Sequence, residues 1–151
     1  IANDNSNGQV VMSGKINDLD SLSNELKKKN IKFVKLPVSA PFHCPLMKNA
    51  TIEMVKRIND TNFINPNVDI ISNVTASPQN NAKDIKRLLI EQIEKPVKWR
   101  ESIINIIDND VNKFIEIGPG KVLSGLIKRI NRNVKLNQVN NLIDLNNFTN
   151  D

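Results

Sequence analysis

The chain has 151 residues, of which 39% are hydrophobic and 25% charged, so it is long enough for one domain with a real core or for two pieces of a larger one. No apolar run approaches the roughly 20 residues that span a bilayer, and a single cysteine excludes an internal disulfide and fits a reducing compartment. The formal charge of +5 is spread along the chain and aromatic residues make up only 4%, which argues against a surface that stacks nucleic-acid bases. We therefore expect a soluble, intracellular type of protein with no membrane or nucleic-acid partner.

The first 38 residues predict a strand, a helix and a second strand. Two valines between glycines favour a short strand within 8–14, and leucines on one face predict a helix over 19–30, with Asp18 or Asp20 as its cap. Alternation of apolar residues and lysines predicts the second strand over 31–38. Two strands cannot bury a sheet face alone, so we expect this βαβ unit to pair with further polypeptide. The start at Ile1, which is not a methionine, likewise suggests the middle of a longer protein.

The rest of the chain alternates helix and strand patterns, which predicts an α/β class with a mostly parallel sheet. Helices are expected over 46–60, from about 85 to before Pro96 with Asp84 or Asn81 as cap, over 99–107 and over 122–130. Strands are expected near 68–74 and over 112–117, and the tail allows one short strand and a short helical end.

The segment SAPFHCPLMKNA, residues 39–50, holds the only histidine of the chain, His43. Pro41 and Pro45 bracket it and stiffen the loop, because proline fixes its own φ and restricts the residue before it. The loop follows a predicted strand and precedes a helix, which is where sites of α/β proteins lie. A stiff loop suits a general base, since the nitrogen must stay within hydrogen-bond reach of the proton that it takes. A surface or core histidine without a chemical role is the competing interpretation.

Other chemistries have weaker support. Cys44 is adjacent to His43, but neighbours on an extended segment point to opposite sides, so a small buried filler is the expected role of Cys44. Histidine, cysteine and carboxylates show no metal-ligand spacing. The stretch GPGK at 118–121 lacks the full phosphate-loop pattern and is interpreted as a strand-to-helix turn, although the N–H groups at that helix start could face an anion.

Four stretches occur in an order that resembles one known family. VSAPFHCPLMKNA resembles the histidine segment of malonyl-CoA:acyl carrier protein transacylases, and NSNGQVVMSG is similar to a strand of that family. EQIEKPVKW and FIEIGPGKVLSGLIKRI are similar to two further family motifs, so the resemblance covers nearly the whole chain up to about residue 130. The acyltransferase domains of polyketide and fatty acid synthases match these segments less closely.

The resemblance implies a fold and a division of the chain. Residues 1–38 would be the second half of a ferredoxin-like small subdomain, and residues 39–151 the C-terminal part of an α/β-hydrolase-like large subdomain. The family nucleophile is a serine in a Gly-His-Ser-x-Gly turn, and an arginine further along binds the malonyl carboxylate. No Gly-x-Ser-x-Gly occurs in this sequence, so both residues are expected upstream and the isolated chain is expected to be inactive.

The resemblance also implies roles for four residues. His43 would be the base, held by the main-chain carbonyl of Gln92 in place of the usual aspartate. Phe42 would line the acyl pocket, where a bulky residue goes with malonyl, and Asn5 matches a family asparagine near the cleft between the subdomains. The implied reaction moves malonyl from malonyl-CoA to the phosphopantetheine thiol of acyl carrier protein in type II fatty acid synthesis, through a malonyl-serine and without a cofactor.

The expected partners are malonyl-CoA and an acidic acyl carrier protein, and the full-length protein is expected to be a monomer. The compartment would be the cytoplasm of a bacterium or a plastid-type organelle of a eukaryote. Two alternatives stay open, an acyltransferase domain of a larger synthase with another acyl preference and a non-catalytic module that binds carrier protein.

Overall fold

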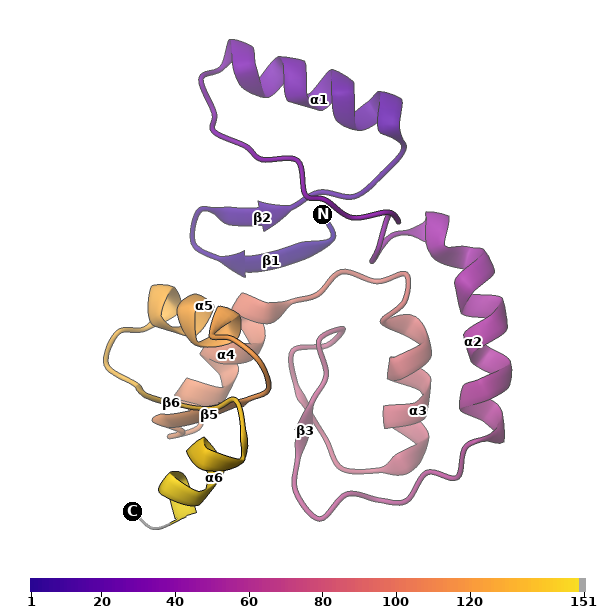
Figure 1. Ribbon diagram of the computed structural model, residues 1–151. Coiled ribbons are helices and arrows are strands. Elements are labelled where there is room, and N and C mark those ends of the chain that lie inside the picture. The colour runs from indigo at the N-terminus through magenta and orange to yellow at the C-terminus, as the bar shows by residue number, and fades with distance from the viewer. Residues whose placement is uncertain (150–151) are drawn as a thin grey trace.

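Helices and short strands are both present in residues 1–149, the part of the chain that the computed structural model describes (Figure 1). The helices are α1 (Ile16–Lys28), α2 (Lys48–Asp60), α3 (Ala82–Glu91), α4 (Trp99–Asp108), α5 (Val122–Ile130) and α6 (Leu142–Thr149), with a 3-10 turn, η1 (Pro45–Met47), directly before α2. The strands are β1 (Asn3–Ser6), β2 (Gln9–Val11), β3 (Ile70–Ile71), β4 (Pro78–Gln79), β5 (Lys113–Ile117) and β6 (Lys135–Val139). Within residues 1–149, no helix has both the length and the apolar character that a membrane span requires.

The described strands form three separate pairs, so the expectation of a mostly parallel sheet is wrong for this part of the chain. The pairs β1–β2 and β3–β4 are antiparallel, and only β5–β6 is parallel, with Lys113 opposite Lys135 and Ile117 opposite Val139. The difference lies in the connections. Only between β5 and β6 does a helix, α5, return the chain to the same end, whereas a tight turn joins β1 to β2. The mixed α/β class is confirmed.

The N-terminal unit departs most from its prediction. The helix begins at Ile16, three residues before the predicted start, so Asp18 lies inside the first turn, and Lys15 at the cap position makes no side-chain cap. A strand also forms at β1, where none was predicted.

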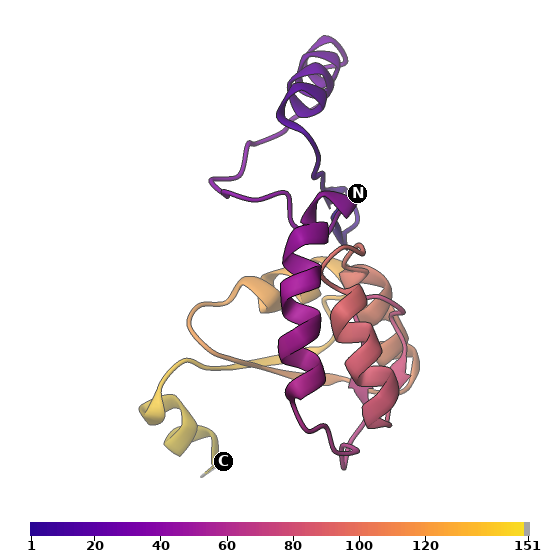
Figure 2. The same cartoon turned by 90° about the vertical axis from the view of Figure 1, so that its right-hand side faces the viewer.

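Residues 31–38 form no strand. Val34 is 84% exposed, and Ile31, which alternation places on the opposite side of an extended segment, is 50% exposed, so neither side of this segment is well covered among the described residues. An extended segment gains its hydrogen bonds only from a neighbouring strand. Helix α1 has no buried residue and stands apart from the other helices in two views (Figures 1 and 2).

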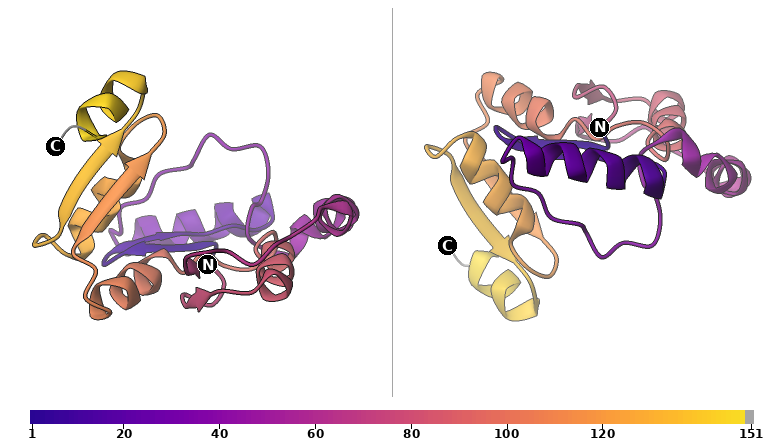
Figure 3. Two further views of the ribbon diagram at one scale, coloured as in Figure 1. Left: turned by 90° about the horizontal axis from the view of Figure 1, so that it is seen from below. Right: turned by 90° about the horizontal axis from the view of Figure 1, so that it is seen from above.

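The buried residues gather where α4 and α5 meet β1 and β5. Ile103 of α4 and Leu126 and Ile127 of α5 are buried, together with Ala2 and Val97, and the Val97 N–H donates to the Ala2 carbonyl at 2.7 Å. Arg100 of α4 donates three hydrogen bonds of 2.7–3.1 Å to the carboxylate of Asp4, and these fasten β1 to α4. Seen from below and above, the β5–β6 pair lies next to α5 at one side of the molecule (Figure 3).

Helices α2 and α3 lie side by side in Figure 2 and form the second packed layer. Leu88 of α3 and Ile58 of α2 are buried. The predicted cap at Asn81 is present, because its side-chain oxygen accepts the N–H of Asp84 at 2.8 Å. This pair of helices brings the histidine loop, which precedes α2, next to the turn that follows α3.

Candidate active site

The loop before α2 closes on itself around His43. The Cys44 thiol donates to the Pro41 carbonyl at 3.1 Å, and the N–H of Met47 donates to the Cys44 carbonyl at 3.0 Å. His43 has a φ of 58°, in the left-handed region that non-glycine residues rarely adopt, and Cys44 returns to extended backbone. The loop thus holds His43 in a strained conformation, and the half-buried Cys44 serves as an internal tie, with its thiol engaged by the loop.

His43 and Gln92, which are 49 residues apart in sequence, meet in space. The imidazole Nδ1 lies 2.9 Å from the main-chain oxygen of Gln92. A carbonyl can only accept, so this hydrogen bond requires the proton on Nδ1 and leaves Nε2 unprotonated in the neutral ring. Nε2 is therefore the nitrogen that is free to take a proton from another group.

The carbonyl of Gln92 is available because of where α3 ends. The helix stops at Glu91, and the last carbonyls of a helix have no donor in a following turn. The Gln92 side chain folds back over this turn, with its Nε2 3.4 Å from the Lys95 carbonyl and 3.4 Å from His43 Nδ1. An ion pair of 3.9 Å between Lys48 and Glu94 links the start of α2 to the same turn.

The structure does not join the other two predicted site residues to this pair. Phe42 precedes His43 in the loop and is 47% exposed. Asn5 lies half-buried on β1. Among the described residues no hydrogen bond connects Phe42 or Asn5 to His43 or Gln92, so these two positions still rest on the sequence resemblance.

The start of α5, which follows the GPGK turn, already faces an anion, the carboxylate of Glu116 on β5. It accepts the backbone N–H of Leu123 at 3.0 Å and that of Ser124 at 2.8 Å. Although desolvation acts to raise the pKa of Glu116, the hydrogen bonds from Ser124 and its neighbours outweigh it and lower that pKa. These N–H groups therefore face a carboxylate of the chain itself. Sequence reasoning missed Glu116, whose signal was an acidic residue near the end of a strand, six residues before the first residue of a helix.

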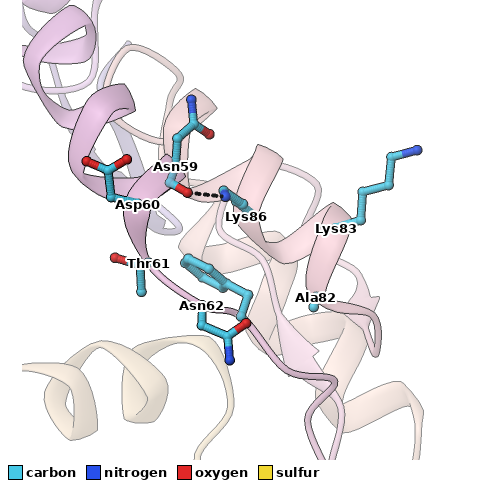
Figure 4. A pocket seen from close by; sticks show the side chains of 8 residues that line it. Asn59, Asp60, Thr61, Asn62, Ala82, Lys83 and Lys86 are labelled. Carbon is cyan, nitrogen blue, oxygen red and sulfur yellow. Dashed lines mark hydrogen bonds between the residues drawn. The ribbon is translucent and has the colours of Figure 1, made fainter.

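A surface hollow of about 510 Å³ lies at the other end of α2 (Figure 4). Residues 59–63 line it together with Lys83 and Lys86 of α3, and Lys86 donates to the Asn59 carbonyl at 3.0 Å. A helix of 13 residues is about 20 Å long, so this hollow is separated from the histidine loop by the length of α2. Within residues 1–149 no three histidine, cysteine or acidic side chains are grouped as metal ligands.

Known proteins match this chain over nearly its whole length. Malonyl CoA-acyl carrier protein transacylase of Bacillus subtilis (strain 168) is 44% identical over 137 residues, which are 89% of this chain and 43% of that protein. The protein of the same name from Staphylococcus aureus (strain COL) is 41% identical over 145 residues, which are 95% of this chain and 47% of that protein. No protein-family model matches the chain.

Solved structures that superpose on this chain are also malonyl transferases. An acyl-carrier-protein-S-malonyltransferase from Bartonella henselae superposes with a TM-score of 0.92 at 39% identity, over 99% of this chain and 48% of that one. A malonyl-transacylase in complex with a type II PKS acyl-carrier protein superposes with a TM-score of 0.89 at 32% identity, over 99% of this chain and 49% of that one. The chain spans about half the length of the curated relatives it matches, and it belongs to the malonyl CoA-acyl carrier protein transacylase family.

Proposed function

We propose that this chain contributes the general base of an enzyme that transfers malonyl from malonyl-CoA to the phosphopantetheine thiol of acyl carrier protein. The hydrogen bond from His43 Nδ1 to the Gln92 carbonyl is the observation that carries the proposal. It fixes the ring in the tautomer that a base acting through Nε2 needs, by means of a backbone group in the place of an aspartate. The names of the relatives supply the reaction class.

The proposed reaction runs in two transfers. His43 Nε2 takes the proton of a serine hydroxyl as the serine oxygen attacks the thioester carbonyl, the carbon–sulfur bond breaks, and the imidazolium returns the proton to the departing CoA thiolate. The carrier-protein thiol then gives its proton to His43 and attacks the malonyl-serine, and the serine oxygen recovers a proton as it leaves. The serine is not in this sequence, which contains no Gly-x-Ser-x-Gly, so a further polypeptide segment must supply it.

Phe42 and Asn5 are proposed substrate-side residues. Phe42 is half-exposed beside the base, where a bulky ring would disfavour acyl groups with an added methyl. One methyl in an apolar pocket is worth about 1–3 kcal/mol, so Phe42→Ala should change acyl preference by about tenfold to a hundredfold. Asn5 is proposed to face the cleft between two subdomains.

The proposed subdomains are residues 1–38, as half of a ferredoxin-like unit, and residues 39–151, as part of an α/β-hydrolase-like unit. The position of α1 apart from the other helices and the exposed apolar side chains of 31–38 support a separate unit at the N-terminal side. Residues 150–151 lie outside the described part of the second unit.

The proposed partners are malonyl-CoA and acyl carrier protein, with no cofactor, nucleic acid or membrane, and the whole enzyme is proposed to be a monomer. The net charge of +5 complements an acidic carrier protein. Because the relatives named above come from bacteria, the cytoplasm is the proposed location.

A chimera tests the function. In the Bacillus subtilis relative, the 137 matched residues are replaced by those of this chain, and the product is mixed with malonyl-CoA and acyl carrier protein. We expect a malonyl adduct in the intact mass of the chimera and malonyl transfer to the carrier protein. A preference for another acyl-CoA would favour the synthase-domain alternative. A folded chimera that binds carrier protein but forms no acyl adduct would favour the non-catalytic module.

A further inference from the structure

The side chain of Gln92 lies beside the same imidazole nitrogen as the main-chain oxygen of Gln92. Its amide nitrogen is 3.4 Å from His43 Nδ1 and 3.4 Å from the Lys95 carbonyl oxygen, while the main-chain oxygen is 2.9 Å from Nδ1. A role that needs only a main-chain oxygen could be filled by any residue type, since every residue has one. The side chain at this position has a contact of its own with the base.

These contacts fix which end of the amide faces the ring. Nδ1 gives its hydrogen to the main-chain oxygen of Gln92, and in that tautomer it offers no lone pair to a further donor. If the amide were reversed, its oxygen would lie 3.4 Å from the Lys95 carbonyl oxygen with no hydrogen between the two acceptors. The amide nitrogen therefore donates to Lys95 and lies against the ring without a hydrogen bond to it.

The ring has no charged partner in the loop or the turn that meet at this contact. The other titratable side chains of these two segments are Cys44, Lys48, Glu91, Glu94 and Lys95. Lys48 and Glu94 pair with each other, Glu91 pairs with Arg87, and Lys95 is exposed. The Cys44 thiol donates within its own loop. The oxygen and the amide nitrogen of Gln92 are therefore the polar neighbours of Nδ1 among residues 1–149.

We propose that the Gln92 side chain is a positioning group for the base, in addition to the main-chain oxygen. Held by the Lys95 carbonyl, the amide nitrogen covers Nδ1 and leaves the main-chain oxygen as the acceptor of its proton. The NH₂ group is the positive end of the amide dipole, so its contact favours the neutral ring, which is the form that takes a proton. The inference rests on the proposed function for the role of His43 as a base.

Gln92→Met tests the amide at nearly constant side-chain length, because the main-chain oxygen stays. In the chimera described above, the kcat of malonyl transfer should fall about twofold to tenfold, which is the effect of one neutral hydrogen bond. The KM for malonyl-CoA should stay the same, since the side chain contacts the base and not the substrate. If Gln92→Met loses its helical far-UV spectrum, Gln92→Leu takes its place with the same expectation.

Gln92→Glu tests the charge at the same place. A carboxylate beside Nδ1 stabilises the imidazolium, so the midpoint of the ring titration, followed by NMR of the single histidine of the chain, should rise by about one pH unit. The acid limb of the pH–rate profile of the chimera should move in the same direction. Gln138→Glu is the matched control, because it adds the same charge at an exposed position of β6 and should leave both measurements at the parent values.

A Gln92→Met chimera with the kcat of the parent would overturn the proposal, and so would a Gln92→Glu titration with the midpoint of the parent. A raised KM at unchanged kcat would also overturn it, because the side chain would then bind substrate. The titration is independent of malonyl transfer. A chimera that transfers no malonyl would therefore refute the proposed function, while the titration of the chain would still decide whether the amide acts on the ring.

Discussion

His43 has a backbone conformation that costs energy and a side chain with one fixed hydrogen bond. A left-handed φ at a non-glycine residue costs about 1–3 kcal/mol, and it persists where the surroundings overdetermine it. Here the surroundings are the Cys44–Pro41 tie and the carbonyl of Gln92. With Nδ1 bonded to the Gln92 carbonyl, Nε2 has no hydrogen-bond partner among residues 1–149.

The tautomer of His43 can be observed directly, because the chain has one histidine. We expect ¹⁵N NMR of the neutral ring to show a protonated Nδ1 and a bare Nε2, since the Gln92 carbonyl accepts from Nδ1. The reverse tautomer would contradict the geometry from which the base is inferred.

Glu116 predicts a pH dependence of stability. Its pKa is lowered below the ordinary value of 4.5 in the folded chain, so its stabilising effect is present above pH 4.5 and is lost as the pH falls through the lowered pKa. Glu116→Gln should remove this part of the acid dependence in urea unfolding. It should also cost about 1 kcal/mol at neutral pH, because it weakens a carboxylate cap of α5. Equal acid slopes for the variant and the wild type would contradict the assignment.

The sequence motif around His43 was enough to predict a general base at this residue. The role of Gln92 could be predicted only from the family resemblance, because a backbone carbonyl can come from any residue type and leaves no mark in the sequence. Glu116 was missed, because its role depends on the backbone N–H groups of Leu123 and Ser124, which lie seven and eight residues further along the chain.

Helix α3 positions the Gln92 carbonyl, and its stability depends on its cap. The Asn81 oxygen accepts the Asp84 N–H, and the Asn81 amide donates to the Asp84 carboxylate at 2.6 Å. The hydrogen bonds from Asn81 and Arg87 lower the pKa of Asp84.

Asn81→Ala should lower the free energy of unfolding by about 1 kcal/mol, as measured by urea denaturation, because the first turn of α3 loses its acceptor. The neighbouring Asn80 is exposed and provides the control, since no side-chain hydrogen bond of Asn80 occurs among residues 1–149. A loss for Asn80→Ala equal to that for Asn81→Ala would show that the cap is not the cause.

A salt bridge between Arg100 and Asp4 joins α4 to β1. Arg100 is 40% and Asp4 29% exposed, so solvent screens the pair and a double-mutant cycle with alanine should give a small but measurable coupling energy. The more exposed pair of Lys98 and Glu101, at 3.3 Å, should couple by less than half of that. Equal couplings would mean that the three-bond geometry of Arg100 adds nothing.

Helices were predictable because their signals are local, such as the four-residue apolar repeat of α2 and the cap at Asn81. Strands were less so. The segment 31–38 has a strand pattern and no strand, because a strand exists only with a neighbour, and β1 formed because residues 9–11 and Val97 supply neighbours.

Over the whole molecule, two strand-like segments keep aliphatic side chains exposed. In residues 31–38 and in β5, side chains such as Val34 and Ile117 are not covered by any described element. The proposed enzyme is therefore divided in its chemistry as well as its packing, with the base on this chain and the nucleophile on a segment that this sequence does not contain.

The most direct test of the central claim is the single-turnover rate of malonyl transfer to acyl carrier protein by the chimera, with and without His43→Ala. Removal of a general base costs about a hundredfold to ten-thousandfold, so we expect a loss in that range with the fold retained. Asn80→Ala, which changes an exposed residue before the start of α3, should keep the rate of the parent chimera. A His43→Ala chimera that transfers malonyl at the rate of the parent would contradict the assignment of His43 as the base.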